Sequence, residues 1–254
     1  MSIGRDAGTV IVDMHCHVLV ASALQPGAYG IEDLMATMDG AGVAIAICSV
    51  MGRGPETENA FMAEAADRHR GRLYGYINLD PRDPARALEE LARRAGDPRF
   101  VGIKLHSANH AYFPFSERFE PVYAAIAETR MPVLWHSGTY PTSTPLQIAA
   151  VALEHPEMPC ILGHFGLTDY PAESLVAARL AANVYADTSI QTNLPLLRAF
   201  IDGVGPERLL WGSDYPLYVT EYELAKVDRL NLAPAARALV TGGNARRLYQ
   251  LENP

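Results

Sequence analysis

Short apolar runs alternate with amphipathic stretches along the whole chain. The runs are rich in Val, Ile and Leu, and eight of them lie near residues 9–14, 43–50, 72–78, 100–105, 131–135, 159–163, 183–187 and 208–212. The stretches between them repeat apolar side chains with a helical period, for example Glu58–His69, Ala85–Arg94, Phe119–Thr129, Ala172–Ala182 and Leu194–Ile201. We expect the runs to be β-strands and the stretches to be helices.

This alternation predicts parallel strands joined by right-handed helical crossovers. Eight such units close into a single (β/α)8 TIM barrel with its active site at the C-terminal ends of the strands, and we expect one domain over residues 1–254. The longest connections, Val18–Gly30 and Ser107–Ser116, both follow predicted strands, and Pro234–Tyr249 is expected to be a last helix. A doubly wound open sheet is the alternative fold, although no Gly-x-Gly-x-x-Gly motif follows the first run.

Histidine and aspartate side chains follow several of the apolar runs. His15 and His17 come two residues apart after the first run, and strand alternation aims both imidazoles at the same side. His136, His164 and Asp214 follow the fifth, sixth and eighth runs. In a closed barrel these strand ends lie around one mouth, so we expect the side chains to meet there.

These residue types are those of a mononuclear catalytic metal site. Such a site needs three or four nitrogen or oxygen ligands and one open position, and His15, His17, His136 and Asp214 supply them. Three imidazoles and one carboxylate suit Zn, Mn, Fe or Ni better than Ca or Mg. We therefore expect one divalent metal ion, with zinc as the first choice.

Charge and composition narrow the partners. The chain carries 21 basic and 29 acidic residues, a formal charge of −8, and no basic cluster denser than Arg93-Arg94 or Arg246-Arg247. This argues against nucleic acid and anionic membranes as partners and leaves a small-molecule substrate. No apolar run is long enough to span a bilayer, no signal peptide is evident, and the three cysteines form no paired framework. A cytoplasmic location is expected.

Five segments carry a resemblance to a known family. They are Val12-Asp13-Met14-His15-Cys16-His17, Val101-Gly102-Ile103-Lys104-Leu105-His106, Val133-Leu134-Trp135-His136-Ser137-Gly138, Leu162-Gly163-His164-Phe165-Gly166 and Leu210-Trp211-Gly212-Ser213-Asp214-Tyr215-Pro216. Together they resemble the amidohydrolase superfamily, in particular its amidohydrolase-related branch, which holds metal-dependent hydrolases and decarboxylases similar to aminocarboxymuconate semialdehyde decarboxylase. The resemblance implies four metal ligands and one catalytic group. The implied ligands are His15, His17, His136 and Asp214, and the implied catalytic group is His164.

We expect a metal-dependent hydrolase of a small lactone, ester or amide. A metal-activated water would attack the carbonyl while His164 acts as acid and base, and Asp214 could also serve as base. The alternative is a non-oxidative decarboxylase of a carboxylated aromatic or enoic acid. Hydrolysis is favoured because decarboxylases of this branch tend to be longer and oligomeric, and the short chain leaves little room for their insertions. A barrel that binds a small molecule or a metal without catalysing a reaction is the least favoured alternative.

Four residues after predicted strands are candidates for binding the substrate. In binuclear members of the superfamily that the chain resembles, a lysine at the end of the fourth strand is carboxylated and bridges two metals. For Lys104, at the end of the fourth run, we favour a free cation that binds a substrate carboxylate. His106 lies on the same face of that strand. Arg53 would add a second cation, which favours an anionic substrate, and Tyr140 follows the fifth strand. A homo-oligomer is left open.

Overall fold

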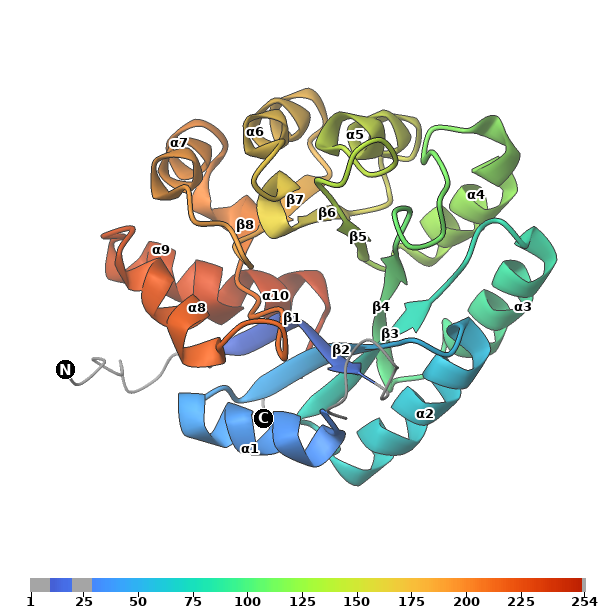
Figure 1. Ribbon diagram of the computed structural model, residues 1–254, viewed down its shortest axis with the longest axis horizontal. Coiled ribbons are helices and arrows are strands. Elements are labelled where there is room, and N and C mark those ends of the chain that lie inside the picture. Colours follow the sequence, from blue (N-terminus) through green and yellow to red (C-terminus); the bar gives the residue numbers. More distant parts are fainter. Residues whose placement is uncertain (1–9, 20–28, 253–254) are drawn as a thin grey trace.

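Eight parallel strands form one sheet whose order follows the sequence. The computed structural model describes residues 10–19 and 29–252. Each strand pairs with the next along the chain, from β1 to β8 (Figure 1). The strands are β1 (Val12–Leu19), β2 (Ile45–Met51), β3 (Leu73–Asn78), β4 (Phe100–Leu105), β5 (Val133–His136), β6 (Cys160–Gly163), β7 (Val184–Asp187) and β8 (Leu209–Leu210). The predicted (β/α)8 barrel is confirmed.

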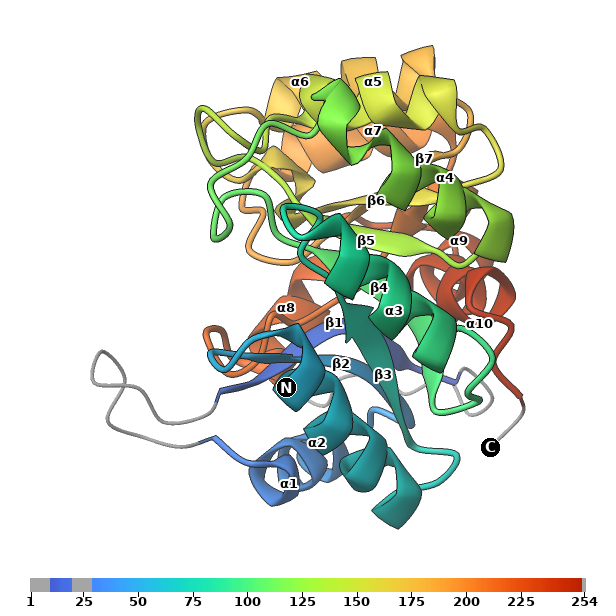
Figure 2. The same cartoon turned by 90° about the vertical axis from the view of Figure 1, so that its right-hand side faces the viewer.

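A ring of helices surrounds the strands (Figures 1 and 2). These helices are α1 (Ile31–Ala41), α2 (Pro55–Arg68), α3 (Pro84–Arg94), α4 (Glu120–Thr129), α5 (Pro145–Glu154), α6 (Pro171–Leu180), α7 (Leu194–Val204) and α8 (Thr220–Asp228). Proline begins four of them, at the position where a helix has no use for the missing N–H. The Asp83 carboxylate caps α3 by accepting from the Arg86 backbone.

Strand alternation divides the apolar side chains into two cores. Val12, Met14 and Tyr76 belong to a small cluster inside the barrel, which also includes Tyr249 from the carboxyl-terminal segment. Cys16, Val18 and the apolar faces of the helices form a larger cluster outside the strands. Residues near the amino ends of the strands therefore fill the barrel, and the polar side chains lie at the opposite end.

A β-bulge in β1 changes which residues face inward. Asp13 pairs with Ala46, but the next pair joins Cys16 to Cys48, so β1 has one extra residue over this stretch. The bulge explains why Met14 belongs to the inner core whereas Cys16 belongs to the outer one. His15 is consequently directed inward together with Met14, its neighbour in sequence.

Backbone hydrogen bonds between β1 and the segment after β8 close the barrel. Met14 N donates to Trp211 O (3.3 Å), Asp214 N donates to His15 O (2.7 Å), and His17 N donates to Tyr215 O (2.6 Å). Gly212 permits this approach, since a Cβ there would lie 2.5 Å from the Cβ of His15. The eighth strand is thus shorter than the predicted run 208–212, because the chain turns irregularly where it meets β1.

The carboxyl-terminal segment differs from its predicted single helix, and the two long connections can be compared with the structure in part. In place of one helix over 234–249, α9 (Pro234–Ala238) and α10 (Asn244–Leu248) flank a π-helical turn, Leu239–Gly243. Residues 107–116 hold no helix or strand, whereas residues 20–28 of the other predicted long connection lie outside the described residues. Among the described helices, none combines the length and apolar character needed to traverse a bilayer.

Candidate metal-binding active site

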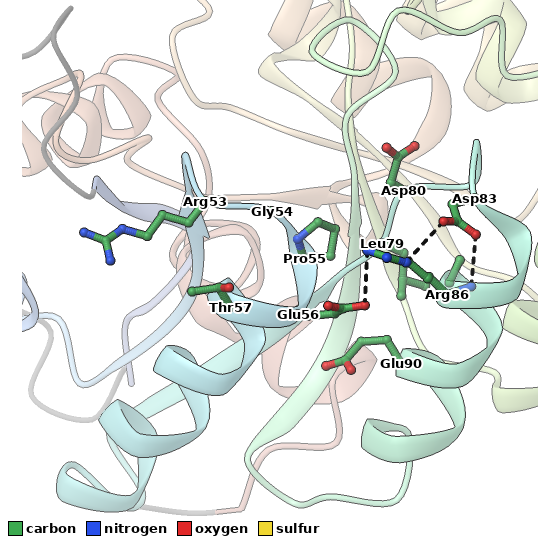
Figure 3. Close-up of a pocket in the computed structure, with 11 residues that line it drawn as sticks. Arg53, Gly54, Pro55, Glu56, Thr57, Leu79, Asp80, Asp83, Arg86 and Glu90 are labelled. Atoms are coloured by element: carbon green, nitrogen blue, oxygen red, sulfur yellow. Dashed lines mark hydrogen bonds and ion pairs between the residues drawn. The ribbon is translucent and has the colours of Figure 1, made fainter.

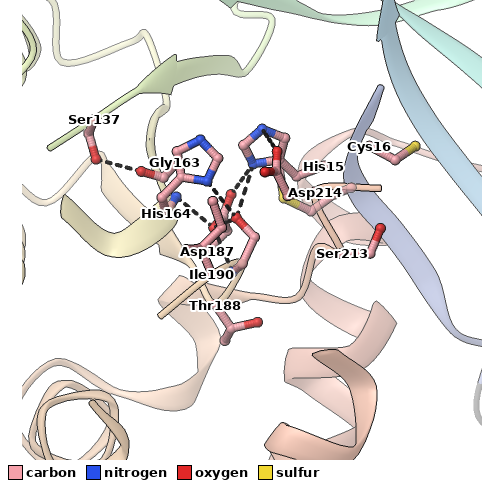
Figure 4. A network of polar contacts seen from close by, with 12 residues as sticks. His15, Cys16, Ser137, Gly163, His164, Asp187, Thr188, Ile190, Ser213 and Asp214 are labelled. Carbon is pink, nitrogen blue, oxygen red and sulfur yellow. Dashed lines mark hydrogen bonds and ion pairs between the residues drawn. The ribbon is translucent and has the colours of Figure 1, made fainter. Parts of the chain in front are cut away.

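Buried polar side chains gather at the carboxyl end of the barrel. They come from β1, from the ends of β6 and β7, and from the segment after β8 (Figure 4). His15, Asp187 and Asp214 are almost completely buried, and His17 and His164 are nearly so. Cys16 points away from the group (Figure 4). Buried polar groups need partners, and the contacts among these residues supply most of them.

Asp187 fixes the orientation of His15. Its Oδ2 lies 2.6 Å from His15 Nδ1, and its Oδ1 accepts from the backbone N–H groups of His164 and Ser189, each at 2.9 Å. Burial raises the pKa of Asp187 to about 6, although hydrogen bonds from Ser189 and His164 oppose that rise. With Nδ1 donating to this carboxylate, the lone pair of His15 lies on Nε2, as in the carboxylate–histidine pairs of metal centres.

His15, His17 and Asp214 bring three potential ligand atoms close together. Asp214 Oδ1 lies 3.1 Å from His17 Nε2 and 3.6 Å from His15 Nε2, and the His17 Nδ1 contacts Ser49 Oγ at 2.7 Å. The other carboxylate oxygen, Asp214 Oδ2, is buried with no hydrogen-bond partner in the described part of the chain. A buried donor set with an unpartnered carboxylate oxygen fits a divalent cation.

His164 and His136 lie beside this triad. The His164 ring lies 4.6 Å from that of His15 and 4.9 Å from that of His136, measured between ring centres. His164 Nδ1 contacts Ser189 Oγ at 3.0 Å, and His136 Nε2 contacts Thr139 Oγ1 at 2.8 Å. His136 belongs to neither of the two groups of ligand atoms that meet at the mouth. Its predicted role as a fourth ligand therefore stays a prediction.

Burial keeps these imidazoles neutral. It lowers the pKa of His136 to about 3 and the pKa values of His15 and His164 well below their usual range, and the nearby Lys104 cation adds to the effect. A neutral imidazole has a free lone pair on one nitrogen, which metal ligation requires. The electrostatics of the site therefore agree with a metal-binding function.

The backbone at the site adopts conformations that side chains rarely tolerate. His164 and Asp214 have φ angles of 63° and 55°, in the left-handed region. Gly163 precedes His164, and a Cβ there would lie 2.6 Å from Trp135 O and 3.1 Å from His15 Cε1. Non-glycine residues in such conformations cluster at functional sites, where the surrounding structure holds them.

Lys104 and His106 reach the site from β4. Lys104 is 5% exposed, and its Nζ lies 3.2 Å from His15 Nε2, so it contacts the lone pair that a metal ion would use. Burial lowers the pKa of Lys104 to about 8, while Asp214 and Asp187 oppose the shift. The His106 ring stacks on His136 with 4.1 Å between centres. Lys104 on β4 and His106 directly after it both line a pocket of about 200 Å³.

Arg53 and Tyr140 lie farther from the group. Arg53 lines a different pocket, of about 250 Å³, between the starts of α2 and α3, and its side chain extends away from Asp80 and Asp83 (Figure 3). Tyr140 is 73% exposed after β5. The structure therefore does not place Arg53 beside Lys104, and substrate binding by Arg53 or Tyr140 stays a prediction.

Asp187, Ser189 and Ser49 are site residues that sequence analysis missed. Asp187 ends β7, so the reasoning that selected His136 and Asp214 at strand ends applies to it equally. Ser49 is the register partner of His17 on β2, and this pairing could not be read from either run alone. Ser189 follows β7 by two residues and carries no distinguishing sequence signal.

A protein-family model matches almost the whole chain and identifies the family. Residues 12–251 match the model of the amidohydrolase family. The chain belongs to the amidohydrolase family. This confirms the resemblance drawn from the five segments and makes the protein an enzyme of the amidohydrolase superfamily.

The curated relatives of this amidohydrolase are mostly decarboxylases. The chain is 23% identical to gamma-resorcylate decarboxylase of Polaromonas sp. strain JS666, with 88% of this chain and 84% of the relative covered. It is 22% identical to the enzyme of that name from Rhizobium sp. strain MTP-10005, with 89% and 85% covered. It is also 24% identical to L-fucono-1,5-lactonase of Burkholderia ambifaria, with 89% and 87% covered.

Solved structures show the same fold. A 2,6-dihydroxybenzoate decarboxylase in complex with 2,6-dihydroxybenzoate has a TM-score of 0.79 at 20% identity, covering 96% of this chain and all of the other. The 5-carboxyvanillate decarboxylase of Novosphingobium aromaticivorans, complexed with manganese, has a TM-score of 0.80 at 16% identity, with 96% and 97% covered.

The expectation of a hydrolase is corrected by these comparisons. It depended on the argument that the chain is too short for a decarboxylase. The chain instead covers 84% of one decarboxylase in sequence and the whole of another in structure. Since most of the relatives are decarboxylases, the alternative that the sequence left open is the one they favour.

Proposed function

We propose that this enzyme is a metal-dependent, non-oxidative decarboxylase of a carboxylated aromatic acid. The observation that carries the proposal is a buried cation, Lys104, beside the group of His15, His17 and Asp214. Such an arrangement suits a substrate with an anionic carboxylate. The decarboxylase relatives in sequence and structure support the reaction class.

The proposed ligands of the metal are His15, His17, His136 and Asp214. For His136, donation from Nε2 to Thr139 would leave the lone pair on Nδ1. The bound cation would act as a Lewis acid that orients and polarises the substrate. Zinc follows from the donor types, whereas the Polaromonas sp. JS666 decarboxylase binds manganese, so Mn²⁺ is the first ion to test.

His164 is the proposed proton carrier. The Ser189 hydroxyl donates to Asp187 Oδ1 at 2.7 Å and therefore accepts from His164 Nδ1–H, which leaves His164 Nε2 unprotonated. Because burial lowers its pKa, the protonated imidazole is a stronger acid than a free histidine and gives up its proton more readily. The Asp214 carboxylate is the second candidate for this role, with Oδ2 unpartnered.

The reaction replaces a carbon–carbon bond by a carbon–hydrogen bond. Lys104 holds the carboxylate. His164, neutral at rest, takes up a proton from solvent at Nε2 and transfers it to the ring carbon that bears the carboxylate. The bond to the carboxylate then breaks, its electron pair returns to the ring, and carbon dioxide leaves. His164 returns to its neutral form, so each turnover takes up one proton and consumes no water.

Product analysis tests this proposal. The Mn²⁺-loaded protein is incubated with 2,6-dihydroxybenzoate, the compound bound by one structural neighbour, and with 5-carboxyvanillate. We expect at least one of the two acids to give the decarboxylated aromatic product and carbon dioxide in equal amounts. Recovery of both acids unchanged, with hydrolysis of L-fucono-1,5-lactone instead, would refute the decarboxylase.

A further inference from the structure

Asn78 stands beside Lys104 in the pocket next to the proposed metal centre. It ends β3 and is the register partner of Lys104 on β4. Asn78, Lys104 and His106 all line the pocket of about 200 Å³. Asn78 is 8% exposed, and the proposed reaction assigns it no role.

Both hydrogens of the Asn78 amide are used by the protein. Nδ2 donates to Val50 O at 2.7 Å and to Glu58 Oε2 at 2.9 Å. Since both partners are acceptors, this network fixes which end of the amide is nitrogen. The other end, Oδ1, is buried and has no hydrogen-bond partner among residues 10–19 and 29–252.

The surroundings hold Asn78 rigidly. Its backbone N–H donates to Asn59 Oδ1 at 2.8 Å, and Asn59 Nδ2 donates back to its carbonyl at 3.0 Å. Glu58 is itself fixed, because Oε1 accepts from the backbone of Gly52 and Gly54 at 2.8 and 3.0 Å. Asn78 Oδ1 therefore cannot turn toward another protein donor without breaking these bonds.

We propose that Asn78 is a specificity-determining residue whose Oδ1 accepts a hydrogen bond from a hydroxyl or amino group of the substrate. An unpaired buried acceptor destabilises the empty site, because it has lost its hydrogen bonds to water. A donor on the ligand removes this penalty. Lys104 in the same pocket binds an anionic group, so the substrate carries an acid and a donor on one ring. The inference rests on the proposed decarboxylase for the identity of that ring.

This chemistry separates two kinds of phenolic acid. A ring with a free hydroxyl facing β3 supplies the hydrogen that Oδ1 needs. A ring with a methoxy group there presents only an acceptor and leaves two oxygens facing each other without a hydrogen. A site with a fixed polar group rejects such an analogue more strongly than an apolar pocket does.

A binding comparison tests the proposal without requiring turnover. The probe is 2-nitroresorcinol, an inhibitor bound by the Polaromonas decarboxylase, compared with its mono-O-methyl ether, by calorimetry on Mn²⁺-loaded protein. The variants are Asn78→Ala and Asn78→Thr, which remove the amide oxygen. Asn59→Ala is the matched control, because it removes the bonds to the Asn78 backbone and leaves the acceptor in place.

We expect the wild type to bind the diol roughly tenfold more tightly than the ether. The preference should fall to about twofold or less in both Asn78 variants and persist in Asn59→Ala. Equal affinities in the wild type, the same preference in the Asn78 variants, or no binding of either probe would overturn the proposal. Carbon dioxide release, measured in parallel, reports on the proposed reaction separately, since either result can fail while the other holds.

Discussion

His15 holds the central place among the side chains at the barrel mouth, because both of its ring nitrogens have partners. Nδ1 contacts Asp187 Oδ2 at 2.6 Å, and Nε2 lies 3.2 Å from Lys104 Nζ and 3.6 Å from Asp214 Oδ1. Strand alternation predicted from sequence that His15 and His17 share a face. It could not show that the carboxylate orienting His15 comes from β7, because that contact depends on closure of the barrel.

Asp187 is a positioning residue, and its amide variant tests this role. In Asp187→Asn the side chain no longer offers a carboxylate to His15 Nδ1, so His15 is less firmly oriented. We expect Mn²⁺ affinity to fall by roughly 10–100-fold, measured by metal titration of chelator-treated protein. Asp202→Asn, which alters an exposed ion pair with Arg198, should leave affinity unchanged. Equal affinity in both variants would exclude the role.

His164 is expected to act in proton transfer and not in metal binding. His164→Asn should retain its metal and lose carbon dioxide release by roughly 10²–10⁴-fold. Elemental analysis and turnover on the same preparation separate the two effects. His69→Asn, at the end of α2, serves as the control. Unchanged turnover in His164→Asn would remove it from the mechanism, and loss of metal would make it a ligand.

At the scale of elements, the β-bulge in β1 has the largest effect on the site, because it lies beside His15 and contacts the segment after β8. Asp13 Oδ1 accepts from His15 N (3.2 Å) and Ser213 N (3.0 Å), and Asp13 Oδ2 accepts from Ser213 Oγ (2.5 Å). These bonds hold the bulge and join β1 to the segment before Asp214. Apolar periodicity located the strand, but it does not encode an extra residue, so the sequence alone could not predict that Met14 faces inward as well as His15.

Removing the Ser213 hydroxyl tests this junction. Ser213→Ala leaves the buried Asp13 Oδ2 without its side-chain donor and Tyr215 N without its acceptor. We expect a loss of about 1–3 kcal/mol in the free energy of unfolding, measured in urea. Ser116→Ala is the control, since this hydroxyl makes no capping hydrogen bond. Equal stability of the two variants would show that the junction depends on backbone bonds alone.

At the scale of the whole molecule, the carboxyl-terminal segment closes the end of the barrel opposite the site. Tyr249 OH lies 2.6 Å from Tyr76 OH, which donates to Met14 O at 2.5 Å. Eight alternating runs were sufficient to predict the barrel, and ligand-type residues at strand ends were sufficient to predict its mouth. The reaction could not be predicted, because chain length was a poor guide and strand-end motifs do not encode substrate contacts such as those of Asn78.

The Tyr76–Tyr249 contact should contribute to stability without affecting the metal. Tyr249→Phe removes one hydroxyl from a buried pair, so we expect a loss of roughly 1 kcal/mol and normal Mn²⁺ affinity. Thermal unfolding and metal titration check the two expectations. Tyr222→Phe changes an exposed tyrosine and should alter neither. Weaker metal binding in Tyr249→Phe would mean that the two ends of the barrel are coupled.

The measurement that tests the account most directly is release of labelled carbon dioxide from carboxyl-labelled 2,6-dihydroxybenzoate. Chelator-treated protein is assayed before and after addition of Mn²⁺. The account predicts no carbon dioxide release without metal. On addition of Mn²⁺, the rate of release should rise and reach its maximum at about one equivalent of Mn²⁺ per chain. Release that is equal with and without metal would contradict the metal site, and no release at any metal loading would contradict the decarboxylase for this substrate.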